Sequence, residues 1–144
     1  MEINSYIANV CEEDNLDEFF ELITLDDLKH SSKENKDLLL YLCFVGGNIS
    51  EFRLAKIFLE YGANINYFPY GEEKHSTILW NAMQSKYDIY FQELGTDGEE
   101  RQVYEIKGII FLLKNGADPN IKGIFCTKHK TCLDIAIELY NLDN

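Results

Sequence analysis

The chain has 144 residues, a hydrophobic fraction of 46% and a formal net charge of -12. This length and composition are typical of one folded domain with its own core and exclude a disordered chain. The negative charge disfavours a nucleic-acid partner, and without a run of about 18 apolar residues the sequence offers no membrane-spanning helix.

Acidic residues are concentrated at the start of the chain. Residues 1–37 contain eleven carboxylates and three lysines (Lys29, Lys33 and Lys36). Such a segment is expected to attract a basic partner. The alternative is that its charge only keeps the protein in solution, and the sequence leaves both interpretations open.

The N-terminus and the cysteines indicate the compartment. Residues 1–10 lack a basic region followed by an apolar one, so we expect no signal peptide. Four scattered cysteines, Cys11, Cys43, Cys126 and Cys132, then favour free thiols in a reducing cytoplasm.

Three segments share one apolar spacing, at i, i+3, i+6 and i+7, which predicts three helices of the same type. The matching sets are Leu16, Phe19, Leu22 and Ile23; Phe52, Ala55, Phe58 and Leu59; and Ile106, Ile109, Leu112 and Leu113.

Two of these helices are followed by the same closing motif, Gly-Ala with Asn three residues after the Ala. Gly62 and Gly116 come directly after the last apolar positions, where a helix commonly ends on a left-handed residue. Asn66 and Asn120 suit the turn into the next unit. The first helix lacks this motif and has Asp26 and Asp27 in its place.

A second motif, the start motif, marks the start of the helix that precedes each of the last two of these helices, and of a further helix near the C-terminus. Its clearest copy is Thr131-Cys132-Leu133-Asp134-Ile135-Ala136, in which the threonine can cap a helix. More degenerate copies begin at Thr77 and at Asp37.

Together these motifs resemble those of ankyrin repeats, which have about 33 residues with two helices each. The resemblance implies an all-α solenoid and one domain over residues 1–144. The expected repeats cover roughly 3–35, 36–66 and 67–120, and a terminal capping helix covers 130–142. The first helix of the first repeat is expected over about 5–12.

The distance from Gly62 to Gly116 exceeds one repeat by about 21 residues. Most of the excess falls between Ala82 and Ile106, around the turn Gly95-Thr96-Asp97-Gly98. We therefore expect two elongated helices that form a projecting hairpin in the third repeat.

The resemblance implies that turns and first helices form a face that binds another protein. The turn after Asn66 is aromatic, and aromatic residues are enriched at binding hot spots; alternatively, Tyr67 and Phe68 fold back onto a neighbouring turn. The expected partner-binding residues are Tyr67, Phe68, Tyr70, Glu72, Glu73, Trp80, Tyr87, Glu99 and Glu100.

Chemical sites are weakly indicated. Cys126, His129 and Cys132 have a spacing that zinc could use, but a structural site needs a fourth ligand, from His75 or Cys43. We expect no metal, no cofactor and no enzyme, because no phosphate loop, nucleophile elbow or metalloprotease helix is present. Three lysines, Lys122, Lys128 and Lys130, form a small basic turn.

The resemblance extends to small acidic bacterial immunity proteins built from ankyrin repeats. It implies a monomeric inhibitor that blocks a protein with a basic surface, such as a toxin. Two alternatives remain: a viral or bacterial effector that binds a host or defence protein, and a generic scaffold.

Overall fold

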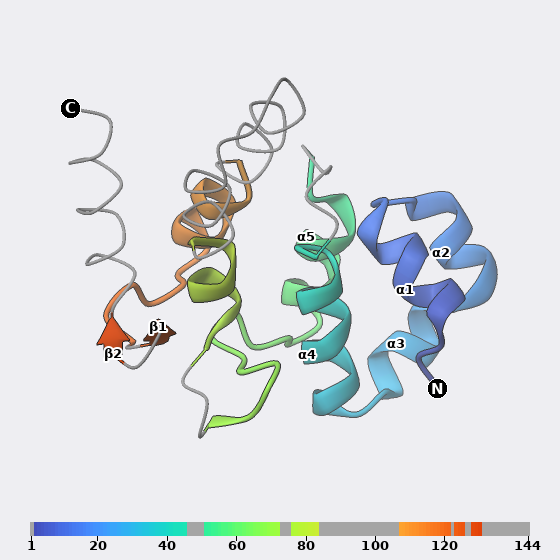
Figure 1. Ribbon diagram of the computed structural model, residues 1–144. Helices are drawn as coiled ribbons and strands as arrows, with labels where there is room; N and C mark the ends of the chain where they lie inside the picture. The colour runs from blue at the N-terminus through green and yellow to red at the C-terminus, as the bar shows by residue number, and fades with distance from the viewer. Residues whose placement is uncertain are drawn as a thin grey trace. The chain divides into compact units, whose positions relative to one another are not determined.

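The computed structural model of the chain describes residues 2–45, 51–72, 76–83 and 107–121, and the backbone of residues 123–125 and 128–130. The chain divides into two units, Met1–Ile65 and Asn66–Asn144. This division falls where the second predicted repeat ends. Five labelled helices lie in the first unit (Figure 1): α1 (Ser5–Glu12), α2 (Leu16–Leu22), α3 (Leu25–His30), α4 (Lys33–Leu42) and α5 (Arg53–Glu60).

The N-terminal unit contains two stacked helix pairs. Helix α1 packs against α2 and α4, and α4 packs against α5 (Figure 1). The rings of Phe19 in α2 and Phe58 in α5 meet edge to face, with centroids 5.2 Å apart. Equivalent helices of the two pairs are therefore in contact. The predicted helical character is confirmed for this unit, and the ankyrin solenoid over the whole chain stays a prediction.

The core of this unit lies between the two pairs. Each fully buried large apolar side chain contributes roughly 1.5–3 kcal/mol relative to exposure. Side chains with no exposed surface come from α1, α2, α3, α4 and α5, so every helix is anchored: Cys11, Phe19, Leu28, Leu39, Leu40, Leu54, Ala55 and Phe58.

The two Gly-Ala motifs end their helices in the same way. Gly62 follows α5 with φ of 101°, and Gly116 follows the helix at residues 107–114 with φ of 94°. The glycine N–H bonds to the carbonyl three residues earlier, at 3.1 and 3.2 Å. The alanine N–H bonds to the carbonyl five residues earlier, at 2.9 and 3.0 Å. Both are Schellman motifs, so the predicted role of the two glycines is confirmed.

The first helix pair ends differently, in a helix that we did not predict. After α2 the backbone of Ile23 is extended, and Thr24 immediately caps α3. The Thr24 hydroxyl accepts the N–H of Asp27 at 3.0 Å, and the Asp27 carboxylate accepts the N–H of Thr24 at 3.1 Å. This capping box starts a new helix at once, and Ile23, which lies between the two helices, is buried. Leu22, predicted to face inward, is 46% exposed.

Asp37 was predicted to open a helix, but α4 begins at Lys33, and Asp37 joins the middle of α4 to the turn after α5. Its buried carboxylate accepts the backbone N–H of Asn64 at 2.7 Å and lies 3.5 Å from the ammonium group of Lys33. The poorest copy of the start motif therefore has a structural role: the acid at its first position satisfies a donor in the following turn.

The described part of the C-terminal unit also contains capped helices and a hydrogen bond between turns. Residues 78–83 and 107–114 are helical. The Thr77 hydroxyl accepts the N–H of Trp80 at 3.2 Å, as an N-cap should. The side-chain oxygen of Asn66 accepts the N–H of Asp118 at 2.9 Å, which joins two turns. Buried apolar residues are Ile78, Leu79, Trp80, Met83, Ile109, Leu112 and Ala117.

A short antiparallel hairpin adds β-structure to the basic turn. Strand β1 (Gly123–Phe125) pairs with β2 (Lys128–Lys130), with Gly123 opposite Lys130. We predicted a turn here without strands. Most of the predicted projecting hairpin, at 84–106, and the terminal helix after residue 130 lie outside the described residues.

Candidate functional site

The aromatic turn has one prominently exposed ring. Tyr70 is 59% exposed, whereas Tyr67 and Phe68 are half-buried. Glu72 is exposed next to this ring. The turn therefore presents Tyr70 and Glu72 at the surface, and the other two aromatic side chains are partly packed.

The burial of Trp80 contradicts its predicted place in the interface. Its side chain is only 1% exposed, beside the equally buried Ile78 and Leu79. A ring that is already packed contributes to the core and offers no area to a partner, so we remove Trp80 from the candidate surface. Four other predicted contact residues lie outside the described residues: Glu73, Tyr87, Glu99 and Glu100.

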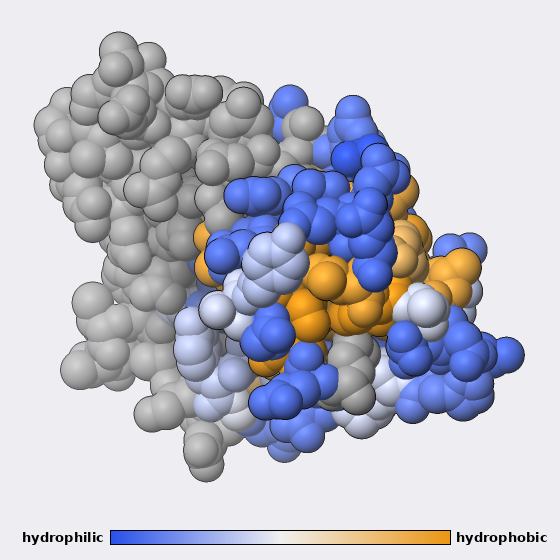
Figure 2. All heavy atoms as spheres, turned by 90° about the vertical axis from the view of Figure 1, so that its right-hand side faces the viewer, coloured by the Kyte–Doolittle hydropathy of each residue, from blue (hydrophilic) through white to orange (hydrophobic). Residues whose placement is uncertain are grey.

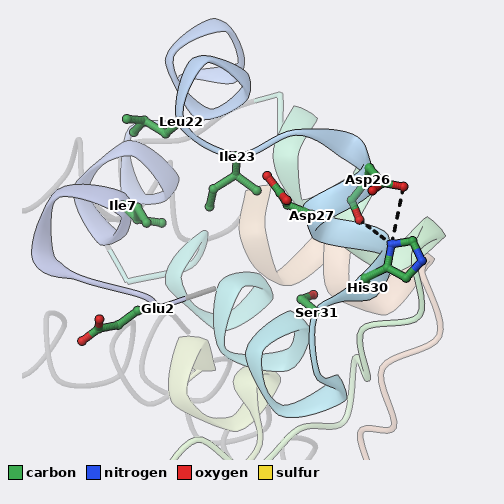
Figure 3. A pocket seen from close by; sticks show the side chains of 8 residues that line it. All are labelled: Glu2, Ile7, Leu22, Ile23, Asp26, Asp27, His30 and Ser31. Atoms are coloured by element: carbon green, nitrogen blue, oxygen red, sulfur yellow. Dashed lines mark hydrogen bonds and ion pairs between the residues drawn. The ribbon is translucent and has the colours of Figure 1, made fainter.

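The N-terminal unit carries a groove that the sequence did not reveal. It has a volume of about 500 Å³ and is formed by the N-terminal segment, α1, the end of α2 and α3. Ile7, Leu22 and Ile23 form its apolar part, and Figure 3 shows Ile7 and Ile23 near its centre, with Leu22 farther out. The remaining lining residues are Glu2, Asp26, Asp27, His30 and Ser31.

Among the residues that the structure describes, three carboxylates and no lysine or arginine line this groove. The imidazole of His30 lies 3.5 Å from the Asp26 carboxylate and 2.9 Å from its backbone carbonyl (Figure 3). The backbone N–H and then the side chain of Thr24 hold the pKa of Asp27 below its usual value. Asp27 therefore stays ionised at neutral pH, and the groove is negative.

The surrounding face is also acidic. Residues 2–31 contain nine carboxylates and one lysine, Lys29: Glu2, Glu12, Glu13, Asp14, Asp17, Glu18, Glu21, Asp26 and Asp27. Figure 2 looks onto this side of the unit and shows apolar side chains gathered between hydrophilic ones. The exposed large apolar residues of α1, α2 and α3 are Tyr6, Leu22 and Leu25.

Several of these acids are engaged within the unit, and Glu18 is the one that joins α1 to α2. The Tyr6 hydroxyl donates a hydrogen bond to the Glu18 carboxylate, which joins α1 to α2. This hydrogen bond and the Glu18 charge raise the pKa of Tyr6. Glu18 therefore helps to fix the helix pair.

Metal and membrane sites are not indicated in the described part of the chain. No group of three histidine, cysteine or acidic side chains there could hold a metal ion. No helix within the same residues is long and apolar enough to cross a membrane. The zinc-like spacing of Cys126, His129 and Cys132 involves side chains outside the described residues.

The sequence contained a partial signal for the groove. Thr24-Leu25-Asp26-Asp27 has the spacing of a capping box with Asp as its last member, and it marks the start of α3. The N-terminal segment that lines the groove carries no comparable pattern, since its position depends on tertiary packing.

Comparisons with known proteins add no assignment. No protein-family model matches the chain, and searches of curated proteins and of solved structures return no match.

Proposed function

We propose that this chain is a non-enzymatic protein-binding module that docks through its acidic N-terminal unit onto a basic surface of another protein. The observation that supports this most directly is the composition of one face. Apolar side chains at Leu22 and Leu25 are exposed there, and the exposed carboxylates of the same segment are Glu2, Glu13, Asp17, Glu21, Asp26 and Asp27. Interfaces typically combine such an apolar centre with a polar rim.

The charge assigns the partner's chemistry. Eight more carboxylates than lysines within 30 residues create a field that accelerates association with a cationic surface and repels acidic proteins. An inhibitor of immunity type, which blocks a basic toxin by covering its surface, uses such a field well. The same face would serve an effector that captures a basic host or defence protein.

The test is affinity capture from the cells that produce the protein, with three full-length baits. One is the natural chain. The second carries Glu2→Gln, Glu13→Gln, Glu21→Gln and Asp26→Asn. The control carries Glu34→Gln, Glu51→Gln, Glu60→Gln and Asp118→Asn, which remove the same charge outside α1–α3.

We expect the natural and control baits to retain the same basic protein and the second bait to lose it. Affinity of the purified pair should fall as salt rises, because the Debye length shortens to about 8 Å at physiological ionic strength. Equal retention by all three baits, or an affinity independent of salt, would contradict the proposal. The identity of the captured protein decides between toxin inhibition and effector activity.

A further inference from the structure

The groove has a combination of groups that specifies an occupant more closely than net charge does. Its apolar part, Ile7 and Ile23, is largely buried, while Leu22 at the outer edge is 46% exposed. Its carboxylates come from Glu2 at one end and from α3 at the other (Figure 3). A bound group that matches both features covers aliphatic carbon and presents positive charge to the carboxylates.

Lysine and arginine side chains have this construction. Their methylene stems pack on apolar surface while the charged head stays near polar groups. A stem resting on Ile7 and Ile23 would direct its head toward Asp27, whose carboxylate points toward Ile23 (Figure 3).

Asp27 can accept such a head without giving up its capping role. Its Oδ2 atom accepts the N–H of Thr24. A carboxylate has about four acceptor positions, and so it can accept a further donor. The pKa of Asp27 is held below its usual value by Thr24, so its charge is already present when the groove is empty.

We infer that the groove formed by Ile7, Leu22, Ile23, Glu2, Asp26 and Asp27 binds a segment of the partner protein in which an arginine or lysine adjoins an apolar residue. The basic side chain fills the groove, and the apolar neighbour covers Leu22. This inference rests on the proposed function and gives its basic partner a specific recognition element.

The test uses isotope-labelled full-length protein and three blocked peptides, followed by amide chemical shifts. Leu-Arg-Leu-Arg-Gly supplies both properties, Ser-Arg-Ser-Arg-Gly only the charge, and Leu-Gln-Leu-Gln-Gly only the apolar surface. We expect saturable shifts at Ile7, Ile23, Asp26 and Asp27 with the first peptide. Each of the other two should bind at least about fivefold more weakly, because an apolar contact or an ion pair is lost.

Two variants locate the binding. Leu22→Ser and Asp26→Asn change exposed side chains and should each weaken the first peptide, by about two- to fivefold. Val45→Ser and Glu60→Gln are the matched controls, because these exposed residues of the same unit do not line the groove. They should leave the affinity unchanged.

Three outcomes would overturn the inference: no saturable shift at millimolar peptide, equal binding of all three peptides, or insensitivity to both groove variants. These outcomes are independent of the proposed function. A basic protein captured by the natural bait but bound equally well by Leu22→Ser and Asp26→Asn would remove the groove and retain the proposed function. If the peptide bound in the groove but the natural bait captured no basic protein, the groove would be retained and the proposed function removed.

Discussion

The Asp14 carboxylate accepts the backbone N–H of Leu54 at 2.8 Å, although the two residues are 40 positions apart. It also accepts the N–H of Arg53 at 2.9 Å. These donors open α5, whose own N-cap residue, Phe52, makes no side-chain cap hydrogen bond. Asp14 itself ends α1 with φ of 54°. One buried acid therefore ends the first helix of one pair and caps the second helix of the next.

Substitutions at Asp14 can separate these two roles. Asp14→Gly keeps the left-handed backbone but leaves two helix donors without the carboxylate, at a cost of roughly 1–3 kcal/mol in the free energy of unfolding. Asp14→Ala should cost about 1 kcal/mol more, because alanine disfavours positive φ. Urea denaturation measures both, with Glu60→Ala as an exposed control. Equal stability of the glycine variant and the natural chain would show that the cap is dispensable.

The equivalence of the two closing motifs predicts equal costs for Gly62→Ala and Gly116→Ala. A Cβ atom at either glycine would have nothing within 4 Å among the residues that the structure describes. Only the positive φ is unfavourable, and each alanine should cost about 1–2 kcal/mol. Asparagine, which tolerates this conformation, should cost less at both positions. Denaturation curves that show a large cost at one glycine and none at the other would argue against a common repeat.

Leu112 and Leu113 are neighbours in one helix with opposite environments. Leu112 has no exposed surface, whereas Leu113 is 45% exposed. Leu112→Ala should therefore destabilise the protein by about 2–5 kcal/mol through an unfilled cavity. Leu113→Ala should change stability by about 0.5 kcal/mol or less. Thermal and urea unfolding of the pair check this, and the reverse order would mean that the helix is rotated.

These results show which features were predictable from sequence. Local motifs were predictable. Gly62 and Gly116, for example, end helices because the left-handed backbone at a helix end favours glycine. The hydrogen bond between Asp14 and α5 was not predictable, because a contact between residues 40 positions apart depends on the packed fold. Burial of Trp80 and exposure of Leu22 were misjudged for the same reason. The groove depends on where the N-terminal segment lies relative to α3, and no local pattern specifies that.

Burial raises the pKa of the Cys43 thiol well above its ordinary value, and the adjacent Cys11 adds to this effect. Cys43 should not react with a thiol reagent near pH 8 until the protein unfolds. Because the folded pKa is the higher one, stabilisation is complete below the ordinary thiol pKa of about 8.5 and is lost as pH rises above it. Cys43→Ala should flatten that alkaline decline in unfolding free energy. Rapid labelling of Cys43 in the native protein would contradict its burial.

Thr24 and Asp27 link the stability of α3 to acid pH. Thr24→Ala removes the hydroxyl that contributes to the low pKa of Asp27 but keeps the backbone N–H, so the pKa should rise only part of the way toward its usual value. Because the folded pKa is lowered, the carboxylate stabilises α3 fully above the usual aspartate pKa, about 3.9. It stops doing so as pH falls through the folded value.

The natural chain should therefore be more stable than Thr24→Ala at neutral pH, and the difference should shrink in acid. Carboxyl chemical shifts report the pKa, and unfolding curves at several pH values report the stability difference. If Thr24→Ala left the pKa of Asp27 unchanged, the backbone N–H alone would lower that pKa. The threonine hydroxyl would then have no electrostatic role in the capping box.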